Sequence, residues 1–356
     1  MKCMLEIFHS RLDRAVADQI FPGYSFAYLT NGGAEICSGG HFTYDVSSPF
    51  VDTTTVYDVA SLTKIIGPMA LTMLLIDEGI LQFDDKIGDY LESFRIDEFK
   101  QAATMRHALT YTLDYDIPGG SKSLMQSLLP SEVVKKTLLC PLKHAPGSNY
   151  MYSNITAFVL TQVIEKVTGR NFYELVQERI LDPLAMYSAT FSPSPELFSN
   201  IPPTEITQER GEVRGFVHDE FSDHLHRGGI SCGAAGLFAS IQDLVPFLQM
   251  ALAGGRYAGQ NLFSPEMVAE WTRNQFPQIL PVKTPLGWGD FNNDLCTVPS
   301  HNVVVKGGFT GCLMVGDQTD NRGFVWLSNR TYPTRPVDTI PLQHLKKDLM
   351  DIFLSK

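Results

Sequence analysis

Several features that define common protein classes are missing from this 356-residue sequence. It has no run of Lys and Arg, and its formal net charge is −11, from 28 basic and 39 acidic residues, which argues against binding to nucleic acid. The six cysteines are scattered without a C-x-x-C pair, so they indicate neither a zinc ribbon nor a disulfide framework. We expect them to act as small buried apolar residues.

Long apolar runs are missing as well. The longest, residues 65–76, is about half a membrane span and contains Gly67, Pro68 and Thr72, which favours a buried helix over a membrane span. The N-terminus carries Glu6 and His9 where a secretory signal needs an unbroken apolar stretch. We therefore expect a soluble, cytoplasmic protein, and its 44% hydrophobic content suffices for one large core or two joined lobes.

The order of patterns along the chain predicts an α+β fold. A helical opening (5–20) is followed by a hairpin signal around residues 31–33, and the chain closes with three short β-rich runs and a helix (337–354). These elements can form one antiparallel sheet flanked by the N- and C-terminal helices. The helical middle then becomes an inserted lobe, which gives a sheet domain of residues 1–57 and 232–356 and an all-α domain of residues 58–231.

The segment VYDVASLTKIIGPMA places Ser61 and Lys64 three positions apart. On a helix these positions share a face, so a hydroxyl and an amine would lie within reach of each other as nucleophile and base. Ser61 would stand at the start of an apolar helix, where its own N–H is free to donate to an oxyanion. Taken alone, such a pair is more often an N-cap serine followed by a solvated lysine.

Two further segments offer polar side chains at the ends of regular elements. In PGSNYMYSNITAFVL, Tyr152 and Asn154 stand just ahead of a helical pattern. In VVVKGGFTG, a β-rich run ends in Lys306 and two glycines, which let a substrate approach the strand closely. The alternatives are a core tyrosine, a helix-capping asparagine and an exposed strand-end lysine.

In this order the motifs resemble those of the serine β-lactamase, penicillin-binding protein and class C-like esterase superfamily: S-x-x-K, then Y-x-N, then K-T-G or H-x-G. The similarity covers most of the chain, from about residue 21 to residue 335, in YDVASLTK, PGSNYMYSN, CGAAGLFAS, LGWG and KGGFTG. It implies a β-lactamase/transpeptidase-like fold with the active site in the cleft between the two predicted domains.

The resemblance also implies roles for individual residues. Ser61 would be the nucleophile of an acyl-enzyme mechanism, with either Lys64 or Tyr152 as the general base. The N–H groups of Ser61 and Phe309 would hold the oxyanion. Substrate contacts are implied for Asn154, Lys306, Gly307, Gly308 and Phe309. Such a mechanism needs no metal and no organic cofactor.

Two departures from the family pattern bear on the substrate. Gly307 stands where Thr or Ser is usual, which removes a hydrogen bond worth roughly 0.5–1.5 kcal/mol to a substrate carboxylate. Lys306 would still favour such a carboxylate. The segment MRHALTYTLDYDIP replaces the H-T-S-G stretch of the family.

We therefore expect a carboxylesterase-like serine hydrolase that acts on small ester or amide substrates. Three alternatives stay open: a muropeptide amidase or D,D-peptidase, a class C-like β-lactamase, and a sensor module that binds an acyl or peptide ligand without turnover.

The segment from His218 to His226 has the composition of a metal site, with an H-x-H pair and several carboxylates. Its spacing fits no standard ligand set, so a solvated loop or an edge of the cleft is the expected role.

Overall fold

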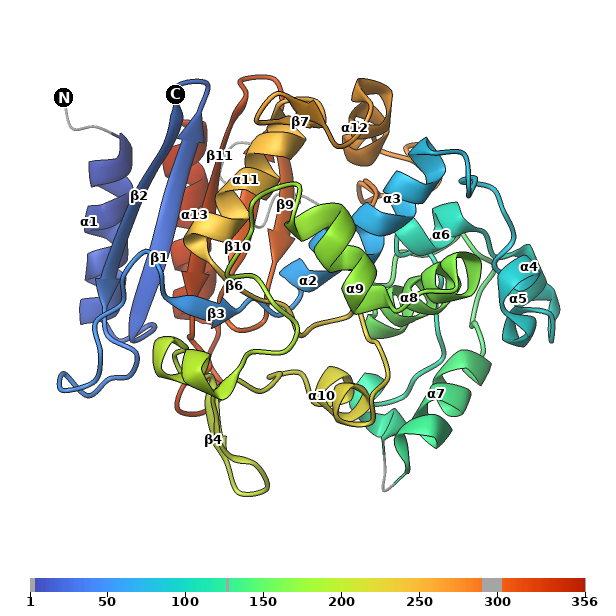
Figure 1. Ribbon diagram of the computed structural model, residues 1–356, viewed down its shortest axis with the longest axis horizontal. Coiled ribbons are helices and arrows are strands. Elements are labelled where there is room, and N and C mark those ends of the chain that lie inside the picture. The colour runs from blue at the N-terminus through green and yellow to red at the C-terminus, as the bar shows by residue number, and fades with distance from the viewer. Residues whose placement is uncertain (1–3, 126–127, 290–302, 356) are drawn as a thin grey trace.

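The computed structural model describes residues 4–125, 128–289 and 303–355, and its centre is a five-stranded antiparallel sheet of order β2-β1-β11-β10-β9 (Figure 1). Its strands are β1 (Gly23–Thr30), β2 (Gly33–Gly40), β9 (Val303–Gly307), β10 (Leu313–Asp317) and β11 (Arg322–Ser328). Tyr24 of β1 lies opposite Ser328 of β11, so the sheet joins strands from distant parts of the chain. The predicted α+β fold is confirmed.

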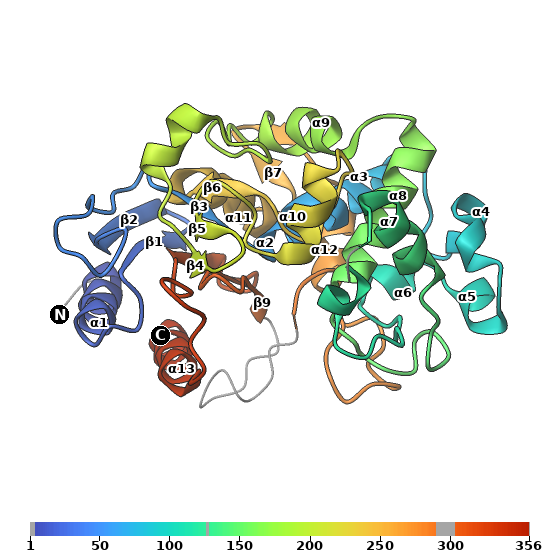
Figure 2. The same cartoon turned by 90° about the horizontal axis from the view of Figure 1, so that it is seen from below.

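Helices cover both faces of this sheet (Figure 2). Helix α1 (Met4–Ala17) and helix α13 (Ile340–Leu354) lie on one face, and α11 (Ile241–Leu252) lies on the other. In α1 the buried residues Met4, Phe8, Leu12 and Ala15 recur at helical spacing, so one apolar stripe faces the sheet. A flat sheet with apolar residues on both faces requires this double cover, and residues 23–29 of β1 are all buried.

The middle of the chain forms the predicted group of helices, which lies beside the sheet (Figure 1). Its helical elements are α2 (Leu62–Lys64), η1 (Ile65–Met69), α3 (Ala70–Asp77), α4 (Ile87–Tyr90), η2 (Glu92–Phe94), α5 (Glu98–Ala102), α6 (Met105–Leu109), η3 (Ser121–Leu124), α7 (Pro130–Leu139), α8 (Asn154–Thr168), α9 (Phe172–Val176) and η4 (Gln177–Leu181). The short helix η5 (Pro195–Asn200) lies apart from this group, where Leu197 and Phe198 pack against Val56 and Phe238. The remaining helix of the C-terminal part is α12 (Pro265–Thr272).

Three small two-stranded ladders complete the secondary structure. They are β3 (Val56–Asp58) with β6 (Phe238–Ser240), β4 (Glu205–Thr207) with β5 (Gly211–Val213), and β7 (Arg256–Tyr257) with β8 (Gln260–Asn261). The β3–β6 ladder ties the segment before Ser61 to the segment before α11. The division of the chain at residues 57 and 232 stays a prediction.

Of the two roles expected for the segment from His218 to His226, the solvated loop is wrong, because helix α10 (Glu220–Arg227) covers most of the segment. The Asp219 side chain accepts a hydrogen bond from the Ser222 N–H and so begins the helix. Phe221 and Leu225, four residues apart, are both buried. The many polar residues of this short helix conceal its apolar period in the sequence.

Three of the four cysteines in the described residues, Cys140, Cys232 and Cys312, are buried free thiols, and Cys37 is partly buried. Cys3 and Cys296 lie outside the described residues. In residues 4–125, 128–289 and 303–355, no helix has both the length and the apolar character to cross a membrane.

Candidate active site

A tight turn after strand β3 places Ser61 at the start of a helical run. Ala60 adopts φ 47°, a left-handed conformation that is costly for a residue with a Cβ. Asp58 holds this turn because its Oδ1 accepts the Ala60 N–H at 2.8 Å. The Ser61 side chain makes no capping hydrogen bond to the helix, so its hydroxyl stays available for chemistry.

Lys64 lies one turn further on, fully buried. Its Nζ donates to Ser61 Oγ at 3.0 Å and to the carbonyl of Ala234 at 2.5 Å. The same amine lies 5.2 Å from the centre of the Tyr152 ring. The spacing between Ser61 and Lys64 therefore produces the hydrogen-bonded pair that the sequence predicted.

Tyr152 comes from the segment just before α8 and is 44% exposed. Two amines lie near its ring: Lys306 Nζ is 4.9 Å and Lys64 Nζ 5.2 Å from the ring centre. The three segments that carry Ser61, Tyr152 and Lys306 thus meet at one place.

Lys306 near the end of β9 is only 2% exposed. Its Nζ donates to the hydroxyl of Tyr111 at 2.6 Å and to the carbonyl of Gly287 at 2.7 Å. Burial, and then the nearby charge of Lys64, hold the pKa of Lys306 well below its usual range. The Lys306 amine is buried and already donates to two protein acceptors, which works against the predicted preference for a substrate carboxylate.

The glycines after Lys306 differ in their surroundings. A Cβ on Gly308 would lie 2.6 Å from the carbonyl oxygen of Val59, whereas one on Gly307 would meet nothing closer than 4.0 Å. Thr310 also donates from its Oγ1 to the Asp58 carbonyl at 2.8 Å. Close backbone packing at Gly308 thus fixes the end of β9 against the turn that carries Ser61.

The N–H groups of Ser61 and Phe309 flank this contact. Within residues 4–125, 128–289 and 303–355, neither N–H donates a hydrogen bond. An oxyanion hole needs unpaired backbone donors of this kind. The Phe309 side chain is 51% exposed and stacks on the His218 ring at a centroid distance of 5.7 Å.

Asn154 is the first residue of α8 and turns its amide toward α10. Its Nδ2 donates to Asp219 Oδ2 at 3.0 Å and to Ser121 Oγ at 3.4 Å. Both amide protons therefore have protein partners, and a substrate donor would meet the Asn154 carbonyl oxygen or Asp219.

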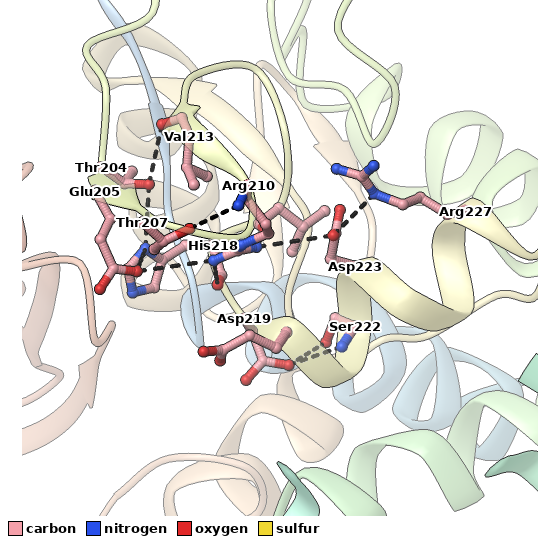
Figure 3. A network of polar contacts seen from close by, with 12 residues as sticks. Thr204, Glu205, Thr207, Arg210, Val213, His218, Asp219, Ser222, Asp223 and Arg227 are labelled. Atoms are coloured by element: carbon pink, nitrogen blue, oxygen red, sulfur yellow. Dashed lines mark hydrogen bonds and ion pairs between the residues drawn. The ribbon is translucent and has the colours of Figure 1, made fainter. Parts of the chain in front are cut away.

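The polar residues from 204 to 227 form a network beside the site (Figure 3). His218 donates its backbone N–H to Asp58 Oδ2 at 2.7 Å, and its buried ring lies 3.1 Å from Thr204 Oγ1. Burial raises the pKa of Asp58 to about 6, although the two backbone hydrogen bonds from His218 and Ala60 oppose this. The segment from His218 to His226 is thus an edge of the site.

The metal-like composition of that segment does not produce a ligand set. Among the residues that the structure describes, no group of three or more His, Cys, Asp and Glu side chains is placed to hold a metal ion. Asp223 instead pairs with Arg227 at 2.9 Å and with Arg210 at 3.7 Å (Figure 3).

Sequence reasoning missed two residues of the site. Tyr111, in the segment noted only as a departure from the family pattern, adopts φ 55° and binds the Lys306 amine, and its ring lies 5.0 Å from that of Tyr152. Asp58 stands in YDVASLTK, yet its neighbours in the sequence do not show which N–H groups will donate hydrogen bonds to its carboxylate. The only signal for Tyr111 was the unusual aromatic residue in a stretch where the family has H-T-S-G.

Comparison with known proteins identifies the family of the chain. The family model described as Beta-lactamase matches residues 8–347. A protein of Salmonella enteritidis PT4 named "Putative D-alanyl-D-alanine carboxypeptidase" is 29% identical over 321 residues, which cover 80% of this chain and 71% of that one. Its namesake in Escherichia coli O157:H7 is 28% identical, covering 92% of this chain and 83% of that one.

Solved structures show the same fold at lower identity. EstCE1, described as a hydrolase with promiscuous acyltransferase activity, superposes with a TM-score of 0.76 at 19% identity, over 97% of this chain and 98% of that one. A β-lactamase/D-alanine carboxypeptidase from Pseudomonas syringae gives a TM-score of 0.75 at 15% identity, over 98% of each chain.

Proposed function

The chain belongs to the Beta-lactamase family of serine hydrolases, and from that premise we propose that Ser61 forms the acyl-enzyme with small ester or amide substrates. The observation that carries the proposal is the hydrogen bond of 3.0 Å between Lys64 Nζ and Ser61 Oγ, at the start of a helix and beside Tyr152. A serine hydroxyl needs such a neighbour to take its proton as it attacks a carbonyl.

Lys64 and Tyr152 are the two candidates for the base in this proposal. Lys64 already bonds the hydroxyl, and Tyr152 lies close to both amines. The proton removed from Ser61 passes to the leaving group, and the same base then activates the water that releases the acyl group. Lys306 lies beside Tyr152, and its charge would affect how readily the Tyr152 hydroxyl loses its proton. The hydrogen bond to Tyr111 holds the Lys306 amine in place.

The free N–H groups of Ser61 and Phe309 would hold the oxyanion, each worth about 3–4 kcal/mol of transition-state stabilisation. Gly307 would keep the strand edge clear for the substrate, Gly308 lets that edge pack on the Val59 carbonyl, and Asn154 would contact the substrate. The buried position of Lys306 and the missing hydroxyl at residue 307 favour a carboxylesterase-like activity over recognition of the carboxylate of a β-lactam.

Hydrolysis of p-nitrophenyl butyrate by wild type and Ser61→Ala tests the proposal, with Ser192→Ala as the matched control at an exposed serine. We expect a loss of at least about a thousandfold in kcat for Ser61→Ala and none for the control. A fluorophosphonate should add its mass to the peptide that contains Ser61. Equal esterase rates in wild type and Ser61→Ala would overturn the proposal.

A second candidate is a D,D-peptidase or muropeptide amidase, which the names of the two relatives support. Incubation with defined muropeptides followed by mass spectrometry tests it, and intact substrate would count against it. Labelling by fluorescent penicillin without release would instead favour a sensor, whereas rapid release would favour a class C-like β-lactamase.

We further propose that the protein acts on small-molecule substrates and does not bind nucleic acid. The net charge of −11 supports the second point. A cytoplasmic location stays a prediction, and fractionation of cells that express the full-length protein would test it.

A further inference from the structure

An open pocket of about 880 Å³ lies between η3 with its flanking residues, α10 and the turn that joins β4 to β5. Its walls include three cations, Lys122, Arg210 and Arg227, and three carboxylates, Glu209, Glu220 and Asp223. Met125 and Leu128 line it as well, so the pocket offers charged groups beside an apolar wall.

Two hydrogen bonds of Asn154 link the pocket to the predicted site. The Asn154 amide bonds Ser121 and Asp219, and the residues that follow these two, Lys122 and Glu220, line the pocket. In the proposed reaction the leaving group departs after the first step, while the acyl group stays on Ser61 until water attacks. A large pocket beside Asn154 is therefore best used by the acyl group.

Most charges of the pocket are already paired. Glu220 pairs with Lys122 at 3.2 Å and with Arg335 at 2.9 Å. Asp223 pairs with Arg227 at 2.9 Å and with Arg210 at 3.7 Å. These groups neutralise one another and leave little net field from the cations.

Asp219 differs because it makes no ion pair with any residue that the structure describes. In Figure 3 its dashed lines run to Ser222 and to none of the arginines drawn. Its Oδ1 accepts the N–H and the hydroxyl of Ser222, at 2.9 and 2.7 Å, and its Oδ2 accepts only the Asn154 amide, at 3.0 Å. A carboxylate offers about four acceptor positions, so one on Oδ2 is left beside Asn154.

We propose that Asp219 is the recognition residue for a protonated amino group on the acyl part of the substrate, so that the enzyme prefers esters or amides of amino acids and short peptides with a free amine. This inference rests on the proposed function. The unpaired carboxylate bonds Asn154 and directly precedes Glu220 of the pocket wall, so an ammonium on an acyl group held beside Asn154 would complete its fourth hydrogen bond. Glu209, exposed on the pocket wall, adds negative charge.

Racemic alanine methyl ester and methyl isobutyrate form the test pair, because a methyl group replaces the ammonium at nearly the same size. Acid release is followed in a pH-stat at about pH 6.5, where the amine is protonated, and each kcat/KM is divided by the hydroxide-catalysed rate of its ester. We expect wild type to favour the amine-bearing ester by at least about tenfold, and Asp219→Asn to reduce this preference to about twofold or less.

Asparagine is a good N-cap, so Asp219→Asn keeps the start of α10 while it removes the charge, although an NH2 group then replaces the oxygen that accepts the Asn154 amide. Asp97→Asn changes another N-cap aspartate, on α5, and should keep the wild-type preference. As a second measurement on wild type, alaninamide should inhibit p-nitrophenyl butyrate hydrolysis at a concentration at least about tenfold lower than isobutyramide does.

Equal normalised rates for the two esters in wild type, or an unchanged preference in Asp219→Asn, would overturn the inference. Neither result depends on whether Ser61 is the nucleophile, because Ser61→Ala is judged separately on p-nitrophenyl butyrate. If Ser61→Ala loses the esterase activity and wild type shows no preference for the amine-bearing ester, the proposed function is retained and the role of Asp219 is rejected.

Discussion

Removal of one buried hydroxyl, in Tyr111→Phe, should weaken both the fold and the reaction. The Lys306 amine has two acceptors, Tyr111 Oη at 2.6 Å and the Gly287 carbonyl at 2.7 Å, and is almost completely buried. Loss of one acceptor leaves a buried donor unsatisfied, which costs about 1–3 kcal/mol of unfolding free energy. The phenylalanine ring keeps its packing against Tyr152, so the effect isolates the hydroxyl.

The pH profile of the same variant provides the readout that a purely structural role would not give. The Tyr111 oxygen stabilises the ammonium form of Lys306, so its removal should lower the pKa of Lys306 further. Lys306 then loses its charge at a lower pH. We expect the alkaline limb of kcat for p-nitrophenyl butyrate to move to lower pH and kcat at neutral pH to fall by about tenfold or more, with little change in KM.

Tyr115→Phe is the matched control, because this equally buried hydroxyl lies near Thr156 but makes no hydrogen bond of ordinary length. Urea denaturation should show it as stable as wild type or more so. If Tyr111→Phe kept wild-type stability and the wild-type pH profile, or if Tyr115→Phe lost as much stability, the assignment of Tyr111 as the anchor of Lys306 would be refuted.

Two further predictions use other parts of the structure. Gly308→Ala should lower kcat/KM by at least about tenfold, because its Cβ would push the end of β9 away from the Val59 carbonyl. Gly307→Ala should change kcat/KM by no more than about twofold. Similar losses in both variants would count against this packing. Burial lowers the pKa of Lys100 to about 8. Above that pH the unfolded chain binds more protons than the folded one, so the free energy of unfolding should rise from about pH 8 to 10.5. Urea denaturation across this range should show a smaller rise for Lys100→Met, and an equal rise would refute it.

Much of this fold follows from local patterns in the sequence. The apolar period of α1, the turn at residues 31–33 and the glycine-separated strands near the C-terminus each have a clear signal, because the buried side of each element is continuous. Helix α10 was missed since its apolar period rests on only two buried residues, Phe221 and Leu225, among many charges.

The site divides in the same way between short-range and long-range information. The hydrogen bond between Ser61 and Lys64 follows from a three-residue spacing on one helix, and the sequence predicts it. The bond between Tyr111 and Lys306 joins positions 195 residues apart, and that between Asn154 and Asp219 joins positions 65 apart. Such contacts depend on how the helices pack on the sheet, and one sequence contains no local pattern that encodes them.

The pairing of β1 with β11 also affects how the protein is made. Strand β1 leaves the ribosome about 300 residues before its partner, which at roughly 5–20 residues per second is a wait on the order of 15–60 s. Throughout that time the apolar side chains of the β1–β2 hairpin lack the strand that later covers one of its edges. Nascent chains should therefore engage holding chaperones at this hairpin, and translation that stalls before β11 should yield aggregates rather than a partly active enzyme.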